Sequence, residues 1–227
     1  MKGSRQVKKV GRTLVVAATT TGLALVATGC ANNVIGADGP QPGIAAQVED
    51  TEITLDELTE VVDGLCTLQA SDPSAATTSR AFAQSRILEA WVGSLVDAEF
   101  AEDRDLDVTT QNPGLELAPG WDDVDEDDRD SLRAYVEAYV FSLAVQEAAA
   151  DETPDPTEYD ITINPRFDAK LEDRVLVPAG DQLSVPVSGE ASLETEAPTP
   201  EMLQDLPDDE LCGKRPEAQE APPIPLG

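Results

Sequence analysis

Three cysteines, Cys30, Cys66 and Cys212, are the residues with the clearest chemistry in this chain of 227 residues. The sequence contains no histidine. Without an imidazole, the chain cannot build a Ser-His-Asp triad, a Cys-His pair, a His-ligated zinc site or a haem with a proximal histidine. The reactions that remain for the three thiols are acylation and disulfide formation. We therefore expect a protein that is not an enzyme and that uses no cofactor and no metal.

The first cysteine follows a segment with the layout of a signal peptide. Residues 1–29 hold every early Lys and Arg and no acid, and they include a weakly apolar run from Leu14 to Val26. A spanning helix needs about 20 apolar residues, so this run is too short to cross a membrane. It ends in Ala27-Thr28-Gly29-Cys30, which resembles the lipobox of bacterial lipoproteins. The resemblance implies cleavage after Gly29, a diacylglyceryl group on Cys30 and an extracytoplasmic chain anchored to the cell membrane.

Two alternatives remain for this segment, an ordinary secretory signal with an incidental cysteine and an uncleaved N-terminal anchor. In the lipoprotein interpretation, residues 30–43 form a flexible linker between the membrane and a folded domain. Two acyl chains hold a protein stably at a membrane, whereas a single chain does so only marginally.

The other two cysteines are candidates for a disulfide. If Cys30 carries lipid, Cys66 and Cys212 are the thiols left, and an exported chain can oxidise them. Their bridge would tie the first predicted helix to the C-terminal segment. Because it restricts the unfolded chain, closing so long a loop contributes about 4 to 5 kcal/mol. The alternative is a buried free Cys66 and a solvent-exposed Cys212.

Acidic residues dominate the charge of the chain. The 45 Asp and Glu residues against 15 Lys and Arg give a formal charge of −30, which would repel a phosphate polymer and excludes nucleic-acid binding. The run from Asp123 to Asp127 has the oxygen spacing that begins an EF-hand loop. However, Asp128 stands where the loop needs glycine, and Ala134 where it needs a bidentate Glu. We expect an acidic helix N-terminus there instead.

Capping signals and apolar periodicity predict three main helices. A capping box from Thr54 to Glu57 starts the first, which runs to about Ala70 before Asp72-Pro73. The second runs from Thr78 or Ser79 to about Arg104, and the third follows the acidic residues 122–130 and ends by about Asp151. The first helix has a stripe of Leu55, Leu58, Val62, Leu65 and Gln69, and the third a buried stripe of Leu132, Tyr135, Val136, Tyr139, Val140 and Leu143.

Short strands and a distinctive tail complete the prediction. Strands are expected within 47–53 and at 161–163, 175–177 and 183–185. The fold class is mostly α with a few short β-strands, in a domain at 44–177. Residues 178–227 form an acidic Pro-rich tail, partly tied down near Cys212 by one helical turn that contains Met202, Leu203, Leu206 and Leu211.

Aromatic residues are the candidates for contact with a peptide. Trp91, Trp121, Tyr135 and Tyr139 could line a groove for apolar segments. Helical spacing favours core packing for all of them except Trp121. That residue follows Pro119-Gly120 in a loop, so we expect its ring to be exposed.

Two segments resemble a known family. Residues 45–58, AAQVEDTEITLDEL, resemble the start of SurA and PrsA N-terminal domains, in which a strand, a tight turn and a capped helix follow one another. Asp50-Thr51 replaces the usual Asn-Gly or Asp-Gly. Residues 161–167, ITINPRF, are similar to a segment of actinobacterial SurA-like lipoproteins, with Asp168 in place of glycine. The two strands are expected to pair, and the resemblance covers residues 44–168.

The resemblance implies a three-helix domain of the chaperone type that engages unfolded polypeptide through apolar grooves. It does not imply isomerase activity, because that activity belongs to a separate parvulin domain of about a hundred residues for which this chain has no room. Trp121, Trp91 and Arg166 are the candidate peptide-binding residues, although Arg166 could instead hold a helix acid in place.

The predicted function is therefore non-catalytic binding of unfolded or exported polypeptides by a lipid-anchored protein. The alternatives are a scaffolding lipoprotein that binds one envelope partner and a degenerate enzyme accessory.

Overall fold

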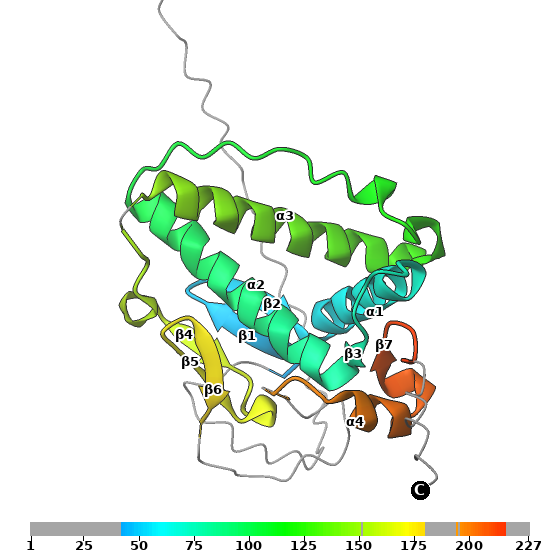
Figure 1. The fold of residues 1–227 in the computed structure, drawn as a ribbon. Helices are drawn as coiled ribbons and strands as arrows, with labels where there is room; N and C mark the ends of the chain where they lie inside the picture. The colour runs from blue at the N-terminus through cyan, green and yellow to red at the C-terminus, as the bar shows by residue number, and fades with distance from the viewer. Residues whose placement is uncertain (1–41, 151, 180–193, 195, 217–227) are drawn as a thin grey trace, which may run out of the picture. The chain divides into compact units, whose positions relative to one another are not determined.

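Three long helices dominate the structure, a computed structural model that describes residues 42–150, 152–179, 194 and 196–216. They are α1 (Leu55–Ser71), α2 (Arg80–Asp103) and α3 (Glu126–Ala148), and they confirm a mostly α chain (Figure 1). All described residues belong to one unit that spans Ile35–Gly227. The predicted signal peptide, most of the predicted linker and the predicted strand at 183–185 lie outside the described residues.

The helices begin and end where local side-chain chemistry places their boundaries. Thr54 Oγ1 accepts from the amide of Glu57, while Glu57 Oε2 accepts from the amide of Thr54, which confirms the capping box. Asp72 caps the other end of α1. Ser79 caps α2 by accepting from the amide of Phe82 at 3.1 Å. α3 carries three acids in its first turn, where the helix dipole favours negative charge.

A three-stranded antiparallel sheet joins the two segments that carry the family resemblance. β1 (Ile44–Val48) lies between β2 (Thr51–Thr54) and β4 (Ile161–Ile163). Val48 pairs with Thr51 on one side, and Ala46 pairs with Ile163 on the other, so the expected pairing of the two segments is confirmed. Asn164 extends this contact, since its side-chain amide donates to the carbonyl of Ile44 at 2.5 Å.

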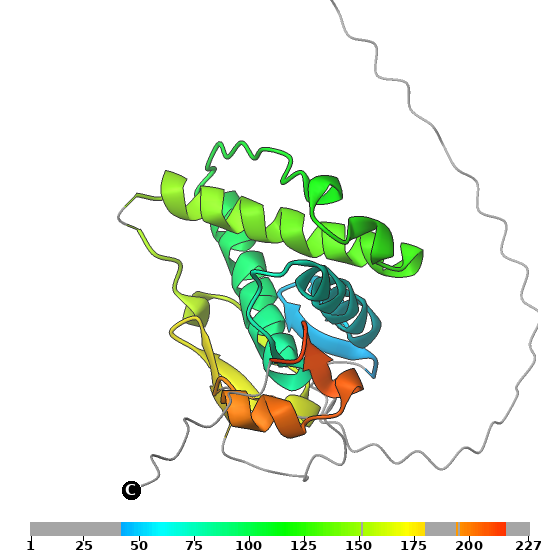
Figure 2. The same cartoon turned by 45° about the vertical axis from the view of Figure 1, so that its right-hand side comes forward.

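Two smaller sheets hold the later part of the chain. β5 (Ala169–Glu172) and β6 (Val175–Pro178) form a hairpin, and β3 (Thr78–Ser79) pairs with β7 (Leu211–Cys212). The helical turn predicted around Leu203 is α4 (Pro200–Asp205), but it contains only Met202 and Leu203 of the four predicted residues, since Leu206 caps its end and Leu211 lies in β7. α4 lies with β7 near the start of α2 (Figure 2). The short 3-10 helices are η1 (Leu115–Leu117), η2 (Trp121–Asp123), η3 (Pro156–Glu158), η4 (Pro165–Phe167) and η6 (Asp208–Glu210).

The core lies where the three long helices meet one another and the sheet. Its fully buried side chains come from every layer and include Val48, Ile53, Leu58, Val61, Leu88, Val92, Val96 and Leu132. Gly64 allows α1 to approach α3 closely, because a Cβ at that position would lie 2.8 Å from Leu132 Cδ2. A larger residue would force this packed contact apart.

The predicted buried stripe of α3 is wrong toward the end of the helix. Tyr139 is 42% exposed and Leu143 is 48% exposed, whereas Ser142 and Val145 are buried. The reason is a polar contact across the helix interface. Ser142 donates a hydrogen bond to Asp97 of α2 at 2.5 Å. Because of this contact, Ser142 faces the helix interface and the next residue, Leu143, faces outward.

Candidate functional site

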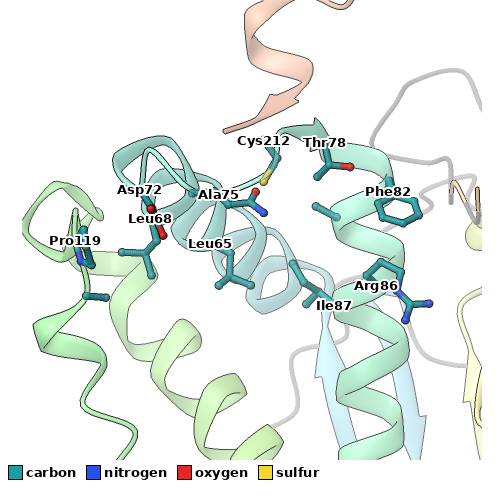
Figure 3. A pocket seen from close by; sticks show the side chains of 13 residues that line it. Leu65, Leu68, Asp72, Ala75, Thr78, Phe82, Arg86, Ile87, Pro119 and Cys212 are labelled. Atoms are coloured by element: carbon teal, nitrogen blue, oxygen red, sulfur yellow. The ribbon is translucent and has the colours of Figure 1, made fainter. Parts of the chain in front are cut away.

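An apolar pocket of about 410 Å³ lies between α1, the first half of α2 and the loop that leads to η2. Figure 3 shows Leu65 between the two charged side chains of the wall, Asp72 on one side and Arg86 on the other. The full lining consists of Leu65, Leu68, Gln69, Asp72, Ala75, Thr78, Phe82, Ala83, Arg86, Ile87, Ala118, Pro119 and Cys212. Most of these side chains are apolar, so the pocket suits an apolar group.

The loop wall of the pocket depends on one glycine. Gly120 has a positive φ of 83°, and a Cβ there would lie 2.3 Å from the side chain of Ser71 at the end of α1. Only glycine fits this conformation and this close approach without strain. The loop can therefore pass against α1 and bring Ala118 and Pro119 into the lining.

Another part of the wall contains the disulfide. Cys66 of α1 and Cys212 of β7 are bonded, with their Cα atoms 4.5 Å apart and 146 positions apart in the sequence. Both are buried, at 7% and 1% exposure. Apart from this bond, β7 is held by the two-residue ladder in which Thr78 pairs with Cys212. The pairing expected from the cysteine count is thus present, and it brings the predicted tail into the pocket wall.

The charged groups of the pocket already have partners. Asp72 accepts hydrogen bonds from the hydroxyl and the amide of Ser74, at 2.7 and 2.8 Å, and these bonds lower its pKa. Arg86 forms an ion pair with Glu89, with Nη1 and Oε1 2.5 Å apart. In contrast, the side-chain oxygen of Gln69 is buried and accepts no hydrogen bond from the part of the chain that the structure describes.

A second polar cluster lies farther along α2 and is closed. The carboxylate of Asp97 is fully buried and accepts two hydrogen bonds from Arg174, at 2.6 and 2.8 Å. It also accepts from Ser142 and from Gln146, at 2.5 and 2.9 Å. Arg174 reaches it from the turn between β5 and β6, where it has a positive φ of 66°. With all its oxygens engaged by donors, Asp97 is suited to anchoring the hairpin rather than to proton transfer.

Sequence reasoning missed both the pocket and this cluster. The available signal was a polar residue on an apolar helix face, Gln69 in the first helix and Asp97 in the second. Their partners and neighbours come from segments far away in the sequence.

The predicted exposure of Trp121 is wrong, because its side chain is 8% exposed. The guanidinium groups of Arg129 and Arg133 lie over the ring, 5.7 and 5.6 Å from its centre, and Trp121 belongs to the hydrophobic core. These two arginines come from the start of α3, which covers the loop. Cation–π contacts of this kind stabilise a buried indole.

The other candidate peptide-binding residues are also away from the pocket. Trp91 is 7% exposed and packs edge-on against Tyr135, with ring centres 5.5 Å apart. Arg166 lies over the ring of Phe167 at 5.5 Å. None of the three residues lines the pocket, so the structure does not bring Trp91, Trp121 and Arg166 together at one site. Gly29 and Cys30 lie outside the described residues.

The acidic run at the start of α3 gathers negative charge. Burial raises the pKa of Asp128, and the nearby charges of Asp63, Asp125 and Glu60 raise it further. Among the described residues, no group of cysteine or acidic side chains is arranged to hold a metal ion. Within those same residues, every helix is too short or too polar to span a membrane.

Comparison with known proteins gives no relative. No family model matches the chain, and no curated protein or solved structure matches it. The resemblance to SurA and PrsA N-terminal domains therefore depends on the two sequence segments that form β1, β2, the start of α1, β4 and η4.

Proposed function

We propose that this chain is a lipid-anchored extracytoplasmic protein that binds unfolded or exported polypeptides without catalysing a reaction. The observation that carries the proposal is the apolar pocket of about 410 Å³ beside the Cys66–Cys212 disulfide. Its three helices and paired strands form a SurA N-terminal-like domain in this proposal, and the acyl groups on Cys30 hold that domain at the cell membrane.

The composition of the pocket supports binding of apolar side chains. Leucine, isoleucine, phenylalanine, alanine and proline side chains make most of its wall. Leu117 adds a further apolar surface, because it is 89% exposed directly before Ala118 and Pro119 of the lining. A protein that binds exposed apolar segments needs such a surface, whereas a fully closed helical domain has none.

The titratable groups of the site support binding rather than catalysis. A general acid at neutral pH needs a raised pKa, and the carboxyl group that lines the pocket, Asp72, has a lowered one. Among described carboxyl groups, Glu99 and Asp128 have a raised pKa, mainly through burial, but neither lines the pocket.

Two adjacent alanines provide a test of the proposal. Ala75 lines the pocket, while Ala76 is exposed and does not. The wild-type chain should slow the aggregation of several unrelated unfolded proteins at stoichiometric ratios, measured by light scattering. Ala75→Phe fills part of the pocket and should weaken this effect, whereas Ala76→Phe should leave it unchanged. Equal activity of the two variants, or no slowing by the wild type, would count against binding at this pocket.

Membrane anchoring needs a separate experiment. Cells that express the wild-type chain should incorporate labelled palmitate into it, and the chain should fractionate with membranes. Cys30→Ser should lose both the label and the membrane association. A wild-type chain without the label would contradict the lipoprotein part of the proposal and leave the pocket test standing.

A scaffolding role is the second candidate, and the outer face of α3 favours it. Tyr139 and Leu143 are one helical turn apart and are 42% and 48% exposed, so they form an apolar strip away from the pocket. A scaffold should bind one envelope protein through this strip. The double variant Tyr139→Ser/Leu143→Ser should then lose that protein in a cross-linking experiment while aggregation is still slowed.

A further inference from the structure

The chain leaves the described part of the structure at the rim of the apolar pocket. Cys212 of the lining pairs with Thr78, which also lines the pocket, and Figure 3 shows the two residues side by side. Two positions later, the carbonyl of Lys214 accepts a hydrogen bond from the hydroxyl of Thr77, the residue before Thr78. The described residues end at Pro216. The segment that follows therefore starts within a few residues of the cavity.

Two further contacts hold this exit in place. The backbone at Gly213 runs close against Thr77, because a Cβ on Gly213 would lie 3.3 Å from the Cα of Thr77. Arg215 donates hydrogen bonds to the carbonyls of Gln204 and Leu206, at 2.8 and 2.7 Å. The chain is thus fixed on both sides of Lys214, so the folded domain itself sets where the next residues begin.

The segment beyond this exit changes from polar to apolar. Residues 217–220, EAQE, carry two acids, whereas residues 221–227, APPIPLG, carry no charge. All of them lie outside the described residues. Ile224 and Leu226 are the side chains of this segment that gain most from burial, because they have the largest apolar surfaces.

The length of the segment is sufficient to bring these side chains to the cavity. Ile224 is eight positions beyond Pro216, and an extended chain of that length spans up to roughly 26 to 29 Å. Because the exit is at the rim, this span exceeds what is needed to turn back and enter a cavity of about 410 Å³. The polar residues 217–220 would then cross the rim, where they stay in water.

We propose that the pocket is the docking site of residues 222–226 of this same chain, PPIPL, with Ile224 in the cavity and Leu226 against its edge. Docking removes the apolar lining and both side chains from water. The inference goes beyond the proposed function, since the docked segment competes with other polypeptides for the same cavity. Another polypeptide enters only when residues 222–226 leave.

Three arguments favour this occupant over a second copy of the chain. A short tether gives the segment an effective concentration on the order of millimolar at the pocket. Prolines at 222, 223 and 225 restrict the backbone, so less conformational entropy is lost on docking. The formal charge of −30 makes two copies repel each other, whereas docking within one chain needs no such approach.

A photoreactive side chain in the segment tests the docking in the full chain. Benzoylphenylalanine in place of Leu226 keeps an apolar group at that position. On irradiation it should form cross-links to the lining, with Leu65, Leu68 and Phe82 as the expected partners, and peptide mass spectrometry identifies them. Mixing isotopically labelled and unlabelled chains shows whether a cross-link lies within one copy or joins two.

Filling the cavity should prevent this cross-link. Ala75→Phe places a ring in the lining, so the cross-link should largely be lost, whereas Ala76→Phe, an exposed neighbour outside the lining, should leave it unchanged. Thermal midpoints of both variants show whether the fold is kept. Equal yields in the two variants would overturn docking in this pocket.

A competition experiment measures the docking without any change in the folded domain. The probe is the fluorescein-labelled peptide APPIPLG, and the measurement is fluorescence anisotropy with the full chain. Ile224→Ser/Leu226→Ser empties the pocket, so it should bind the peptide roughly tenfold more tightly than the wild type does, as when a tethered competitor is removed. Ala218→Ser/Gln219→Ser is the matched control in the polar part and should bind as the wild type does.

The outcomes separate this inference from the proposed function. It is overturned if no lining residue is cross-linked, if the cross-links join two copies, or if Ile224→Ser/Leu226→Ser and the wild type bind the peptide equally. Polypeptide binding still stands in these cases if the wild type slows aggregation. If the cross-links form within one copy but neither the wild type nor Ile224→Ser/Leu226→Ser slows aggregation, the proposed function fails and the internal docking stands.

Discussion

The two halves of α2 are built in contrasting ways. The first half, which includes Phe82, Ala83 and Ile87, forms a wall of the open apolar pocket. The second half is covered by α3 and by the β5–β6 hairpin, and it buries Asp97 with four hydrogen bonds. The same helix thus forms the wall of an open pocket with its first half and part of a closed, fully hydrogen-bonded cluster with its second half.

The two regions also differ in how their buried polar side chains are hydrogen-bonded. Around Asp97 the donors that reach the carboxylate come from the chain itself, so the cluster fixes how the hairpin sits on the helices. Around Gln69 the chain supplies no donor. A satisfied cluster that joins distant segments indicates a structural role, whereas the side-chain oxygen of Gln69 is enclosed by its surroundings without a donor.

Removing the disulfide should have the largest effect on the pocket region. Replacing both Cys66 and Cys212 by Ala frees a loop with a sequence separation of 146. We expect the free energy of unfolding, measured by urea denaturation, to fall by about 5 kcal/mol. Peptide binding should fall as well, because β7 forms part of the pocket wall.

The reduced wild-type chain is the control for this substitution and should match the double variant. A loss of less than about 1 kcal/mol, with peptide affinity unchanged, would mean that the pocket wall does not depend on the disulfide.

Breaking the buried ion pair should have the next largest effect, and only on the closed region. Arg174→Ala leaves the charge of Asp97 buried without its counter-ion, and Arg174 itself is 23% exposed. We expect a loss of about 3 kcal/mol in the free energy of unfolding. Adding Asp97→Asn should recover part of this loss, because the buried group then carries no charge. Peptide affinity should not change.

Lys170→Ala is the matched control in the same hairpin. Its ion pair with Glu172 is more than half exposed on both sides, so the substitution should cost less than about 0.5 kcal/mol. If Lys170→Ala and Arg174→Ala were equally destabilising, the anchoring role of Asp97 would be wrong.

Alkaline pH should probe the boundary between the two regions, at Tyr135. Burial raises the pKa of Tyr135 from 10.0 to about 12, with a further contribution from Tyr139, because the folded state favours the neutral phenol. Its contribution to stability is therefore complete below pH 10.0 and is lost as the pH rises through about 12. Over that window the wild type should lose about 2 kcal/mol more than Tyr135→Phe in urea denaturation.

The more exposed neighbour Tyr139 gives the comparison for this pH effect. Tyr139→Phe should keep most of the alkaline loss, since the phenol of Tyr135 stays packed beside Trp91. Identical pH profiles for the wild type and Tyr135→Phe would show that this phenol ionises as freely in the folded chain as in the unfolded one.

Local signals were sufficient to predict the helices. The capping box at Thr54, the stop at Asp72-Pro73 and the cap at Ser79 each act within a few residues, so the sequence contains everything that sets these ends. The pairing of β1 with β4 is not local and came from the family resemblance instead.

The parts that could not be predicted depend on contacts between distant segments. Trp121 is buried because two arginines of α3 cover its ring. Ser142 faces inward because it donates a hydrogen bond to Asp97 of α2. The pocket is formed by α1, α2, the loop at Pro119 and Cys212, which are far apart in the sequence. A periodic pattern within one segment does not predict how these segments pack together. Gln69 stood out in the apolar stripe of the first helix, but only the surrounding wall shows that its oxygen lacks a partner.

The long span of the disulfide also sets an order of events as the chain is made. Synthesis proceeds from the N-terminus, so Cys66 appears well before Cys212, 146 positions later. During that interval its thiol has no correct partner and is open to cross-linking with other chains. The folded arrangement of α1 and β7 holds the two thiols side by side, so a bond that forms before folding has no such geometry to select the correct partner.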